Sequence, residues 1–360
     1  MAEALHGGRV HAAARELGCA PGELLDFSAN LNPLGPPEGV LRVFREATPA
    51  LLAAYPDGEA PELRALLAAR HGAPEASVVL GHGGAALLML ALRALAPRRV
   101  LVPVPCFREQ PRALAAAGAE LVPFPLPGLR LDLEALGPAL EGCDALLPTT
   151  PHNPTGQLLP RAALLAFAEA HPDLALVVDE AFGDYAPGSS LAPELLARPR
   201  TVLLQSLTKF HAMPGLRVGH ALADPATAAR MAEPQEGWPV GQLDQMAARA
   251  ALEDVAYARR SLEAFREDLA AFRAELEALG LAPLPSGAPF LLVPVPVPGT
   301  RLAAALRREG ILVRTCADWP GLGDGFLRLA VRRRADRARL LEALAALLPD
   351  ALRRPGLGGR

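Results

Sequence analysis

Hydrophobic residues in the middle of the chain fall into short runs that alternate with helical patterns. Seven such runs, rich in Val, Leu and Ala, occupy residues 77–80, 100–104, 120–124, 144–147, 174–178, 201–204 and 219–223. Apolar runs of this length, separated by helices, predict an α/β fold with a mostly parallel sheet covered by helices on both faces. Because ligands of such sheets bind beyond the carboxyl ends of the strands, polar residues at those ends are the candidates for chemistry.

The carboxyl-terminal part follows another pattern. A helical stretch from Pro239 to about Leu279 precedes a smaller α+β unit, with elements expected at 290–297, 301–309, 311–315, 326–331 and in a last helix to about 348. Pro294, Pro296 and Pro298 place the first of these strands at a sheet edge. We therefore expect an amino-terminal segment (1–40), a large domain (41–270) and a small domain (271–360), with residues 355–360 disordered.

Composition excludes several classes of protein. The formal net charge is −3 with interspersed signs, so nothing marks a nucleic-acid surface, and Arg332 to Arg334 are interpreted as a solvated helix start. The amino terminus lacks the pattern of a secretory signal and the apolar helices are broken by Arg and Glu, so we expect a cytoplasmic protein without a membrane partner. The four cysteines are scattered, and no metal site is expected; the histidines at 11, 71, 171 and 220 are interpreted as single surface or capping residues.

Lys209 is the only lysine in the chain, whereas 35 residues are arginine. It lies in Ser206-Leu207-Thr208-Lys209, where an apolar strand ends. A base-composition bias explains why lysine is rare, but it does not explain this position. An amine with a lowered pKa forms an imine with a carbonyl compound, which a guanidinium does not do, so Lys209 is a candidate Schiff-base residue.

Two other enzyme classes share parts of this pattern. Gly81-His82-Gly83-Gly84 opens a helix after a strand, where free N–H groups favour an anion, and with Ala86 it fits a dinucleotide fingerprint. The next strand lacks the acidic residue that would hold a ribose, so a compact phosphate is the better ligand. Ser206-x-x-Lys209 matches the acylating motif of serine β-lactamases, but a chain with one lysine cannot supply their second motif, Lys-Thr-Gly.

Two further strand ends carry polar residues. Asp179 ends the run 174–178, where an ionised carboxylate needs a cation; the protonated nitrogen of a pyridine ring is a suitable one, although a helix cap would also use an Asp. Asn153 lies in the rigid turn 148–156, and its amide can donate to a phenolate oxygen or serve an ordinary Asn-Pro turn. Phe107 follows the strand 100–104, where it can stack on a ring or pack in the core.

Three arginines indicate anionic ligands. Arg217 follows Lys209 by eight residues and can clamp a phosphate together with the hydroxyls of Ser206 and Thr208. Arg314 is expected to end the strand 311–313, and Arg328 lies inside the apolar strand 326–331. Arginines within apolar strands need an anion, so these two predict a substrate with two anionic groups.

Together these motifs resemble the fold-type I pyridoxal 5'-phosphate enzymes related to aspartate aminotransferase, over nearly the whole chain. The shared features are Tyr55-Pro56-Asp57-Gly58, Asn153-Pro154-Thr155-Gly156, Asp179-Glu180-Ala181, Ser206-x-x-Lys209 and Arg217. Among them, the chain is most similar to the threonine-phosphate decarboxylases of cobalamin biosynthesis, and next to the histidinol-phosphate aminotransferases. That similarity rests on residues 6–8, 26–35, 311–316 and 325–332.

The resemblance implies a role for each residue. Lys209 carries pyridoxal 5'-phosphate, Asp179 pairs with its ring nitrogen, Asn153 holds its ring oxygen and Phe107 stacks. Its phosphate would be bound by Gly83, Gly84, Ser206, Thr208 and Arg217, and by Tyr55 from the partner subunit of a homodimer. Arg328 would bind the carboxylate of a small phosphorylated amino acid and Arg314 its phosphate, with His6 and Asn32 from the amino-terminal segment, which covers the site.

The family pattern also contains differences and alternatives. His82 stands where Asn is frequent, Ala86 where Glu is frequent and Phe182 where Tyr is frequent, each change removing single hydrogen bonds worth about 0.5–1.5 kcal/mol. Decarboxylation and aminotransfer use the same catalytic groups and differ in how the substrate is oriented. We therefore expect decarboxylation of L-threonine O-3-phosphate, with aminotransfer to histidinol phosphate or a similar amine as the alternative and a binding protein without catalysis as a third hypothesis.

Overall fold

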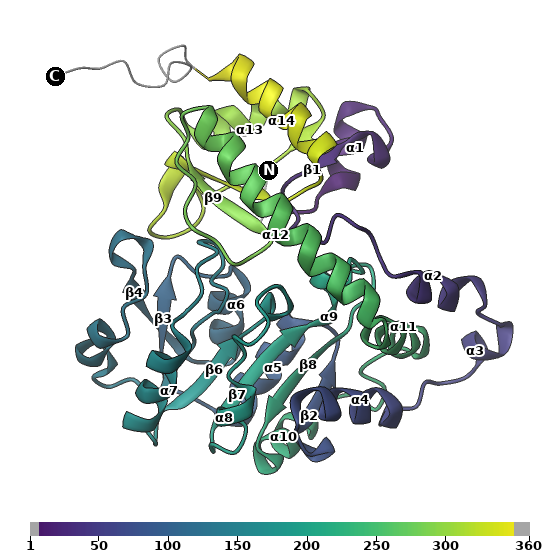
Figure 1. Ribbon diagram of the computed structural model, residues 1–360. Helices are drawn as coiled ribbons and strands as arrows, with labels where there is room; N and C mark the ends of the chain where they lie inside the picture. The colour runs from purple at the N-terminus through teal and green to yellow at the C-terminus, as the bar shows by residue number, and fades with distance from the viewer. Residues whose placement is uncertain (1–6, 349–360) are drawn as a thin grey trace.

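The computed structural model describes residues 7–348. His6 and the residues 355–360 that we expected to be disordered lie outside this range. The described chain forms a larger lower body around one sheet and a smaller upper body, joined by a long helix (Figure 1).

The larger body is built on a seven-stranded sheet with the order β2-β8-β7-β6-β5-β3-β4. Only β8 runs antiparallel to its neighbours, β2 and β7; the other adjacent pairs are parallel. The strands are β2 (Val78–Gly81), β3 (Arg99–Val104), β4 (Glu120–Pro125), β5 (Ala145–Leu146), β6 (Ala175–Asp179), β7 (Thr201–Ser206) and β8 (Gly219–Ala223). Each predicted run therefore forms a strand, with ends displaced by no more than two residues.

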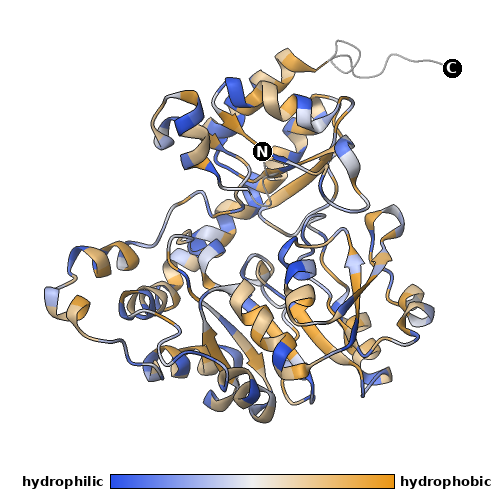
Figure 2. Cartoon of the chain, turned by 180° about the vertical axis from the view of Figure 1, so that it is seen from behind, coloured by the Kyte–Doolittle hydropathy of each residue, from blue (hydrophilic) through white to orange (hydrophobic). Residues whose placement is uncertain are grey.

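Helices cover both faces of this sheet. Along β6, Leu176 and Val178 pack into one hydrophobic cluster, while Ala175 and Val177 pack into the other, as the period of two along a strand requires. Figure 2 shows mainly hydrophobic residues along these strands. The first cluster is covered by α4 (Pro61–His71), α7 (Arg161–Ala170), α8 (Ala192–Leu195) and α11 (Gln242–Glu253), and the second by α5 (Gly84–Leu95), α6 (Glu109–Ala116) and α10 (Pro225–Ala232). The predicted fold class is confirmed.

The smaller body contains two short sheets. Strand β1 (Leu25–Asp26) pairs in parallel with β10 (Ile311–Leu312), and β12 (Phe326–Ala330) lies between β11 (Arg314–Thr315) and β9 (Phe290–Pro294) in an antiparallel sheet. Strand β9 is an edge strand, as its prolines predicted. Helices α1 (Val10–Leu17), α13 (Gly299–Arg308) and α14 (Arg334–Leu347) surround these sheets. The pairing of β1 with β10 supports the proposal that the amino-terminal segment belongs to the small domain.

Two predicted elements are wrong in detail. The helical stretch 239–279 is two helices, α11 and α12 (Val255–Ala278), because Asp254 interrupts the helix and its carboxylate caps α12 by accepting from the Tyr257 N–H at 2.7 Å. The expected strand 311–315 is also divided: β10 and β11 belong to different sheets, so Arg314 begins a strand instead of ending one. Helix α12 is continuous across our proposed domain boundary at residue 270 (Figure 1).

Helix α2 (Glu38–Arg45) packs against α11 at the right of Figure 1, and the short α3 (Pro49–Ala53) follows at the right edge of the view. Helix α9 (Leu207–Phe210) lies at the carboxyl end of β7 below the small body. Among residues 7–348, no helix has both the length and the apolar character needed to cross a bilayer.

Candidate active site

Lys209 lies one turn beyond the buried strand β7. Ser206 ends this strand and caps the short helix α9, its hydroxyl accepting from the Thr208 N–H at 3.4 Å. The Lys209 carbonyl accepts from the Asn32 N–H at 3.1 Å and from the Tyr185 hydroxyl at 3.3 Å. These contacts fix the backbone that carries the amine.

The surroundings of Lys209 favour its neutral form. Burial lowers the pKa of the amine, and the nearby guanidinium groups of Arg217 and Arg328 lower it further, to about 8; the carboxylate of Asp179 acts in the opposite direction. A neutral amine is the form that attacks a carbonyl carbon. The amine therefore has the properties expected of an imine-forming lysine.

Asp179 ends β6, the strand next to β7. Burial raises the pKa of its carboxyl to about 6, while a hydrogen bond from the Ala181 N–H (3.0 Å) and the charge of Lys209 act against this rise. A buried carboxylate is costly in its ionised form unless a positive group or several hydrogen-bond donors compensate it. The site is therefore suited to a ligand that brings a cation, such as a protonated ring nitrogen, to Asp179.

Asn153 and Arg328 meet between the two bodies. The Arg328 guanidinium donates to Asn153 Oδ1 at 2.7 Å and to the Ser28 carbonyl at 3.2 Å. Its Nε is buried and has no hydrogen-bond partner among the described residues. Burial lowers the pKa of this guanidinium to about 10, so an anion would relieve the cost of its charge.

A second anion site lies at the start of α5. Gly83 caps this helix with φ +81°, and a Cβ atom at this position would lie 2.6 Å from Arg217 Nη2, so a larger residue would displace the arginine. Gly84 is the first residue of the helix, whose N–H groups favour a negative ligand. The hydroxyls of Ser206 and Thr208 are buried and lie 2.9 Å apart. Backbone N–H groups, hydroxyls and a guanidinium form a set of donors suited to a phosphate.

A single cavity of about 640 Å³ brings half of the predicted site residues together. Phe107, Asn153, Asp179, Lys209, Arg217, Arg314 and Arg328 all line it. This volume is suited to a cofactor with a small substrate. Arg314 and Arg328 are register partners across β11 and β12, so their guanidinium groups enter the cavity from neighbouring strands.

Asn32 does not reach this cavity, contrary to our prediction. Its amide nitrogen lies 2.8 Å from the Ser261 hydroxyl and 2.9 Å from the Phe210 carbonyl, and its oxygen accepts from the Leu34 N–H. The side chain is therefore occupied in joining the amino-terminal segment to α9 and α12. Asn30, which we did not predict, lines the cavity, and its buried Oδ1 has no partner among the described residues.

Other predicted residues lie elsewhere. Tyr55 is 79% exposed and stacks on Trp238, with ring centroids 4.2 Å apart, outside the cavity of its own chain. His11 is exposed, as we expected of a surface residue, and it also borders the cavity. The interpretation of His71 and His220 as single surface or capping residues is wrong, because their Nε2 atoms lie 3.1 Å apart in a mostly buried pair. Sequence alone could not bring together two residues so far apart in the chain.

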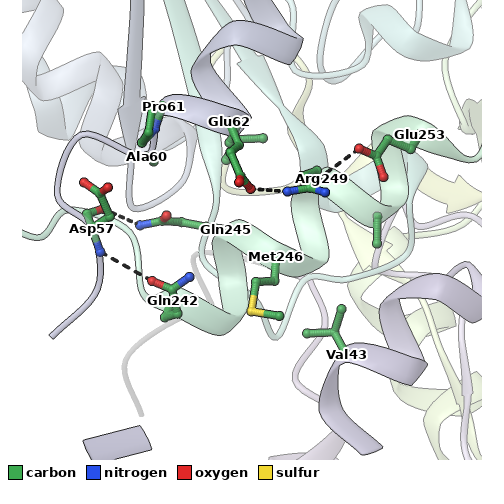
Figure 3. Close-up of a pocket in the computed structure, with 12 residues that line it drawn as sticks. Val43, Asp57, Ala60, Pro61, Glu62, Gln242, Gln245, Met246, Arg249 and Glu253 are labelled. Atoms are coloured by element: carbon green, nitrogen blue, oxygen red, sulfur yellow. Dashed lines mark hydrogen bonds and ion pairs between the residues drawn. The ribbon is translucent and has the colours of Figure 1, made fainter. Parts of the chain in front are cut away.

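A second cavity, of about 380 Å³, lies between α2, α4 and α11 (Figure 3). Its charged side chains are engaged with one another: Arg249 lies 3.0 Å from Glu253 and also contacts Glu62. Within residues 7–348, no cluster of three or more His, Cys, Asp and Glu side chains is arranged to hold a metal ion. The candidate chemistry is therefore concentrated in the cavity around Lys209.

Comparison with known proteins agrees with this geometry. The family model of aminotransferase class I and II matches residues 22–347. The chain belongs to this family. Threonine-phosphate decarboxylase of Salmonella typhimurium is 38% identical over 354 residues, covering 95% of this chain and 96% of that protein. Histidinol-phosphate aminotransferase 2 of Ralstonia nicotianae is 33% identical, covering 96% and 94%.

A solved structure is similar over the same extent. The histidinol-phosphate aminotransferase of Sinorhizobium meliloti, in complex with pyridoxal-5'-phosphate, superimposes with a TM-score of 0.83 at 26% identity, covering 95% of this chain and 94% of that one. As a member of the aminotransferase class I and II family, this chain has pyridoxal 5'-phosphate as its cofactor. The residues present fit it: an amine with a lowered pKa, a buried carboxylate and the Arg217 guanidinium line one cavity, and Gly83 at the start of α5 adjoins that guanidinium.

Proposed function

We propose that this chain decarboxylates L-threonine O-3-phosphate to (R)-1-aminopropan-2-yl phosphate, as a cytoplasmic homodimer in cobalamin biosynthesis. The observation that carries the proposal is the pairing of Arg314 with Arg328 across adjacent strands in the cavity of Lys209. The substrate carries a carboxylate on Cα and a phosphate on the oxygen of Cβ, only a few bonds apart. Two neighbouring guanidinium groups match this spacing of charge.

Each residue has a role in this proposal. Lys209 holds the cofactor, Asp179 pairs with its ring nitrogen, Asn153 contacts its ring oxygen and Phe107 covers its face. Gly83, Gly84, Ser206, Thr208 and Arg217 bind its phosphate. When bound, pyridoxal 5'-phosphate supplies an acceptor for the electron pair left on Cα when a bond to this carbon breaks.

The residues of the chain decide which bond breaks. Arg328, whose guanidinium is held by Asn153 and Ser28, binds the substrate carboxylate and so sets its angle to the ring. The bond from Cα to the carboxylate carbon breaks, CO2 leaves and Cα takes up a proton. We assign the delivery of that proton to Lys209, because burial and the neighbouring guanidinium groups lower the pKa of its amine and so make it a better proton donor.

The homodimer is supported by an exposed apolar surface. Leu41, Phe44 and Leu52, on or near helices α2 and α3, are 42%, 41% and 71% exposed, and Tyr55 follows them. Large apolar side chains that are exposed on successive helices are typical of a protein interface. We propose that a second copy covers it and that Tyr55 reaches the cofactor phosphate of this partner.

Aminotransfer is the second candidate, supported by the 33% identical histidinol-phosphate aminotransferase. In that reaction the two arginines would bind different substrates in turn, because histidinol phosphate has no carboxylate. A protein that binds the cofactor without catalysis is the third hypothesis.

The test is to supply the cofactor-loaded protein with L-threonine O-3-phosphate and, separately, with histidinol phosphate and 2-oxoglutarate. We expect equal amounts of CO2 and phosphorylated aminopropanol from the first mixture, and no CO2 from a Lys209→Ala control. Glutamate formation in the second mixture without CO2 in the first would replace the proposal by aminotransfer. Turnover in neither mixture would support the third hypothesis, a protein that binds the cofactor without catalysis.

A further inference from the structure

The carboxylate of Asp318 contacts two arginines of the cavity lining that come from different parts of the fold. Asp318 Oδ2 lies 2.8 Å from Arg314 Nη2 and 3.8 Å from Arg108 Nε, and the Arg108 Nη1 also donates to the Asp318 carbonyl. Arg314 belongs to β11 of the small body, whereas Arg108 immediately precedes α6 of the large body. Asp318 therefore holds together two like charges that would otherwise repel each other.

This carboxylate depends on the two arginines. Its side chain is 8% exposed, and its Oδ1 is buried without a hydrogen-bond partner among the described residues. A nearly buried carboxylate needs compensation, and here Arg314 and Arg108 supply it through Oδ2. The position of each guanidinium is therefore coupled to Asp318.

Trp319 restricts the same group further. The Arg314 guanidinium lies 4.5 Å from the centre of the Trp319 ring, and that of Arg328 lies 5.3 Å from it. An indole beneath a guanidinium favours a stacked orientation, in which the N–H groups point outward in the plane of the guanidinium. Arg108, Arg314, Trp319 and Arg328 all line the cavity that contains Lys209.

The balance of charge gives Arg108 a function. Arg314 paired with Asp318 has no net charge, which is a weak attraction for a phosphate that carries between one and two negative charges. With Arg108 included, the group has one net positive charge and donors on two sides. A phosphoryl group, with three terminal oxygens, can bridge two such guanidinium groups.

We propose that Arg108 and Arg314 form a two-arginine clamp for the phosphoryl group of the substrate, and that Asp318 is the positioning residue that keeps them together. The inference rests on the proposed function, since it specifies how the phosphorylated substrate is recognised. It adds Arg108 and Asp318 to the predicted substrate site and makes the bound phosphate a contact between the large and small bodies.

The test compares two ligands that differ by the phosphate. Apparent dissociation constants of L-threonine O-3-phosphate and L-threonine are taken from the change in cofactor absorbance immediately after rapid mixing with the holoenzyme, before CO2 is released, for the wild type and for Arg108→Gln. We expect Arg108→Gln to weaken the binding of the phosphorylated ligand by about 10- to 100-fold and the binding of L-threonine by less than about twofold. Arg108→Lys, which keeps the charge, should recover part of the loss, and Arg112→Gln on the exposed side of α6 should leave both constants unchanged.

Asp318 is tested through its coupling to Arg108. If Asp318 positions that guanidinium, Arg108→Gln should weaken the binding of L-threonine O-3-phosphate by less than about threefold in an Asp318→Asn background, because the arginine is no longer held there. An equal loss in both backgrounds would refute the positioning role. Equal weakening of both ligands by Arg108→Gln, or no weakening, would refute the clamp, as would a wild type that does not prefer the phosphorylated ligand.

The same variant separates this inference from the proposed reaction. If the wild type transaminates histidinol phosphate and releases no CO2, decarboxylation is refuted, while selective weakening of histidinol phosphate binding by Arg108→Gln would still support the clamp. If the wild type releases CO2 and Arg108→Gln binds L-threonine O-3-phosphate normally, the reaction stands and the clamp fails.

Discussion

The lowered pKa of Lys209 can be measured directly, because the chain has one lysine. Burial and the charges of Arg217 and Arg328 bring this pKa from 10.5 to about 8 in the protein without cofactor. At pH 7.5 about a quarter of the Lys209 side chains are then neutral, against about one in a thousand for an ordinary lysine. The structure therefore predicts a gain of about 200-fold in the reactive form of the amine.

The perturbations are single changes of charge around this amine. Arg328→Gln removes a positive neighbour and should raise the Lys209 pKa, whereas Asp179→Asn removes the negative neighbour and should lower it. Arg301→Gln, on an exposed position of α13, is the matched control and should leave the pKa unchanged.

The assay is acylation of the cofactor-free protein by a small acylating reagent that reacts with amines, at a series of pH values. Mass spectrometry of the peptide that contains Lys209 gives the extent of reaction, and the α-amino group is followed separately on its own peptide. We expect half-maximal reactivity near pH 8. A midpoint at pH 10 or above, or identical midpoints for Arg328→Gln and Asp179→Asn, would refute the electrostatic reasoning.

Two further predictions concern stability and assembly. Burial lowers the pKa of His71 to about 4 and that of His220 well below 6.5, so as the pH falls through 6.5 the unfolded chain takes up protons that the folded chain does not. Through His71 alone, the unfolding free energy should fall by about 2 kcal/mol between pH 7 and pH 5. In urea titrations, replacing both histidines by Gln should reduce this loss by at least that amount, whereas His82→Gln, at an exposed position, should not reduce it. An unchanged pH dependence of the double variant would count against a neutral pair. If Tyr55 acts in the partner subunit, equal mixtures of Tyr55→Ala and Lys209→Ala subunits should recover about a quarter of wild-type activity by random pairing; recovery no greater than that of the separate variants would place Tyr55 in its own subunit's site or in none.

Local patterns were sufficient for most elements of the large sheet. Six of the seven runs were recognisable because strands buried on both faces are apolar along nearly their whole length, whereas the edge strand β4 is partly exposed. The break between α11 and α12 also had a local signal, since Asp254 is a favoured N-cap residue whose carboxylate accepts from the Tyr257 N–H. The division of 311–315 into two strands had no local signal. Strand β10 pairs with β1 and strand β11 pairs with β12, so the division depends on partners elsewhere in the chain.

The residues of the candidate site show the same limit. Lys209, Asp179 and Asn153 were identified because each follows a strand, and parallel strands bring their carboxyl ends to one edge. Asn30 and Asn32 lie in one short segment, and the sequence could not distinguish them. Only the packing against α9 and α12 decides that the Asn32 amide is used for structure while Asn30 lines the cavity.

The sequence by itself determined the α/β fold class, the family, and the amine and carboxylate of the site, because these depend on the period of apolar residues and on residue types at strand ends. The tertiary structure alone decided the pairing of Arg314 with Arg328, the sharing of Asp318 with Arg108, and the contact between His71 and His220. Charge and burial act through space, so the properties of these groups depend on neighbours that are remote along the chain.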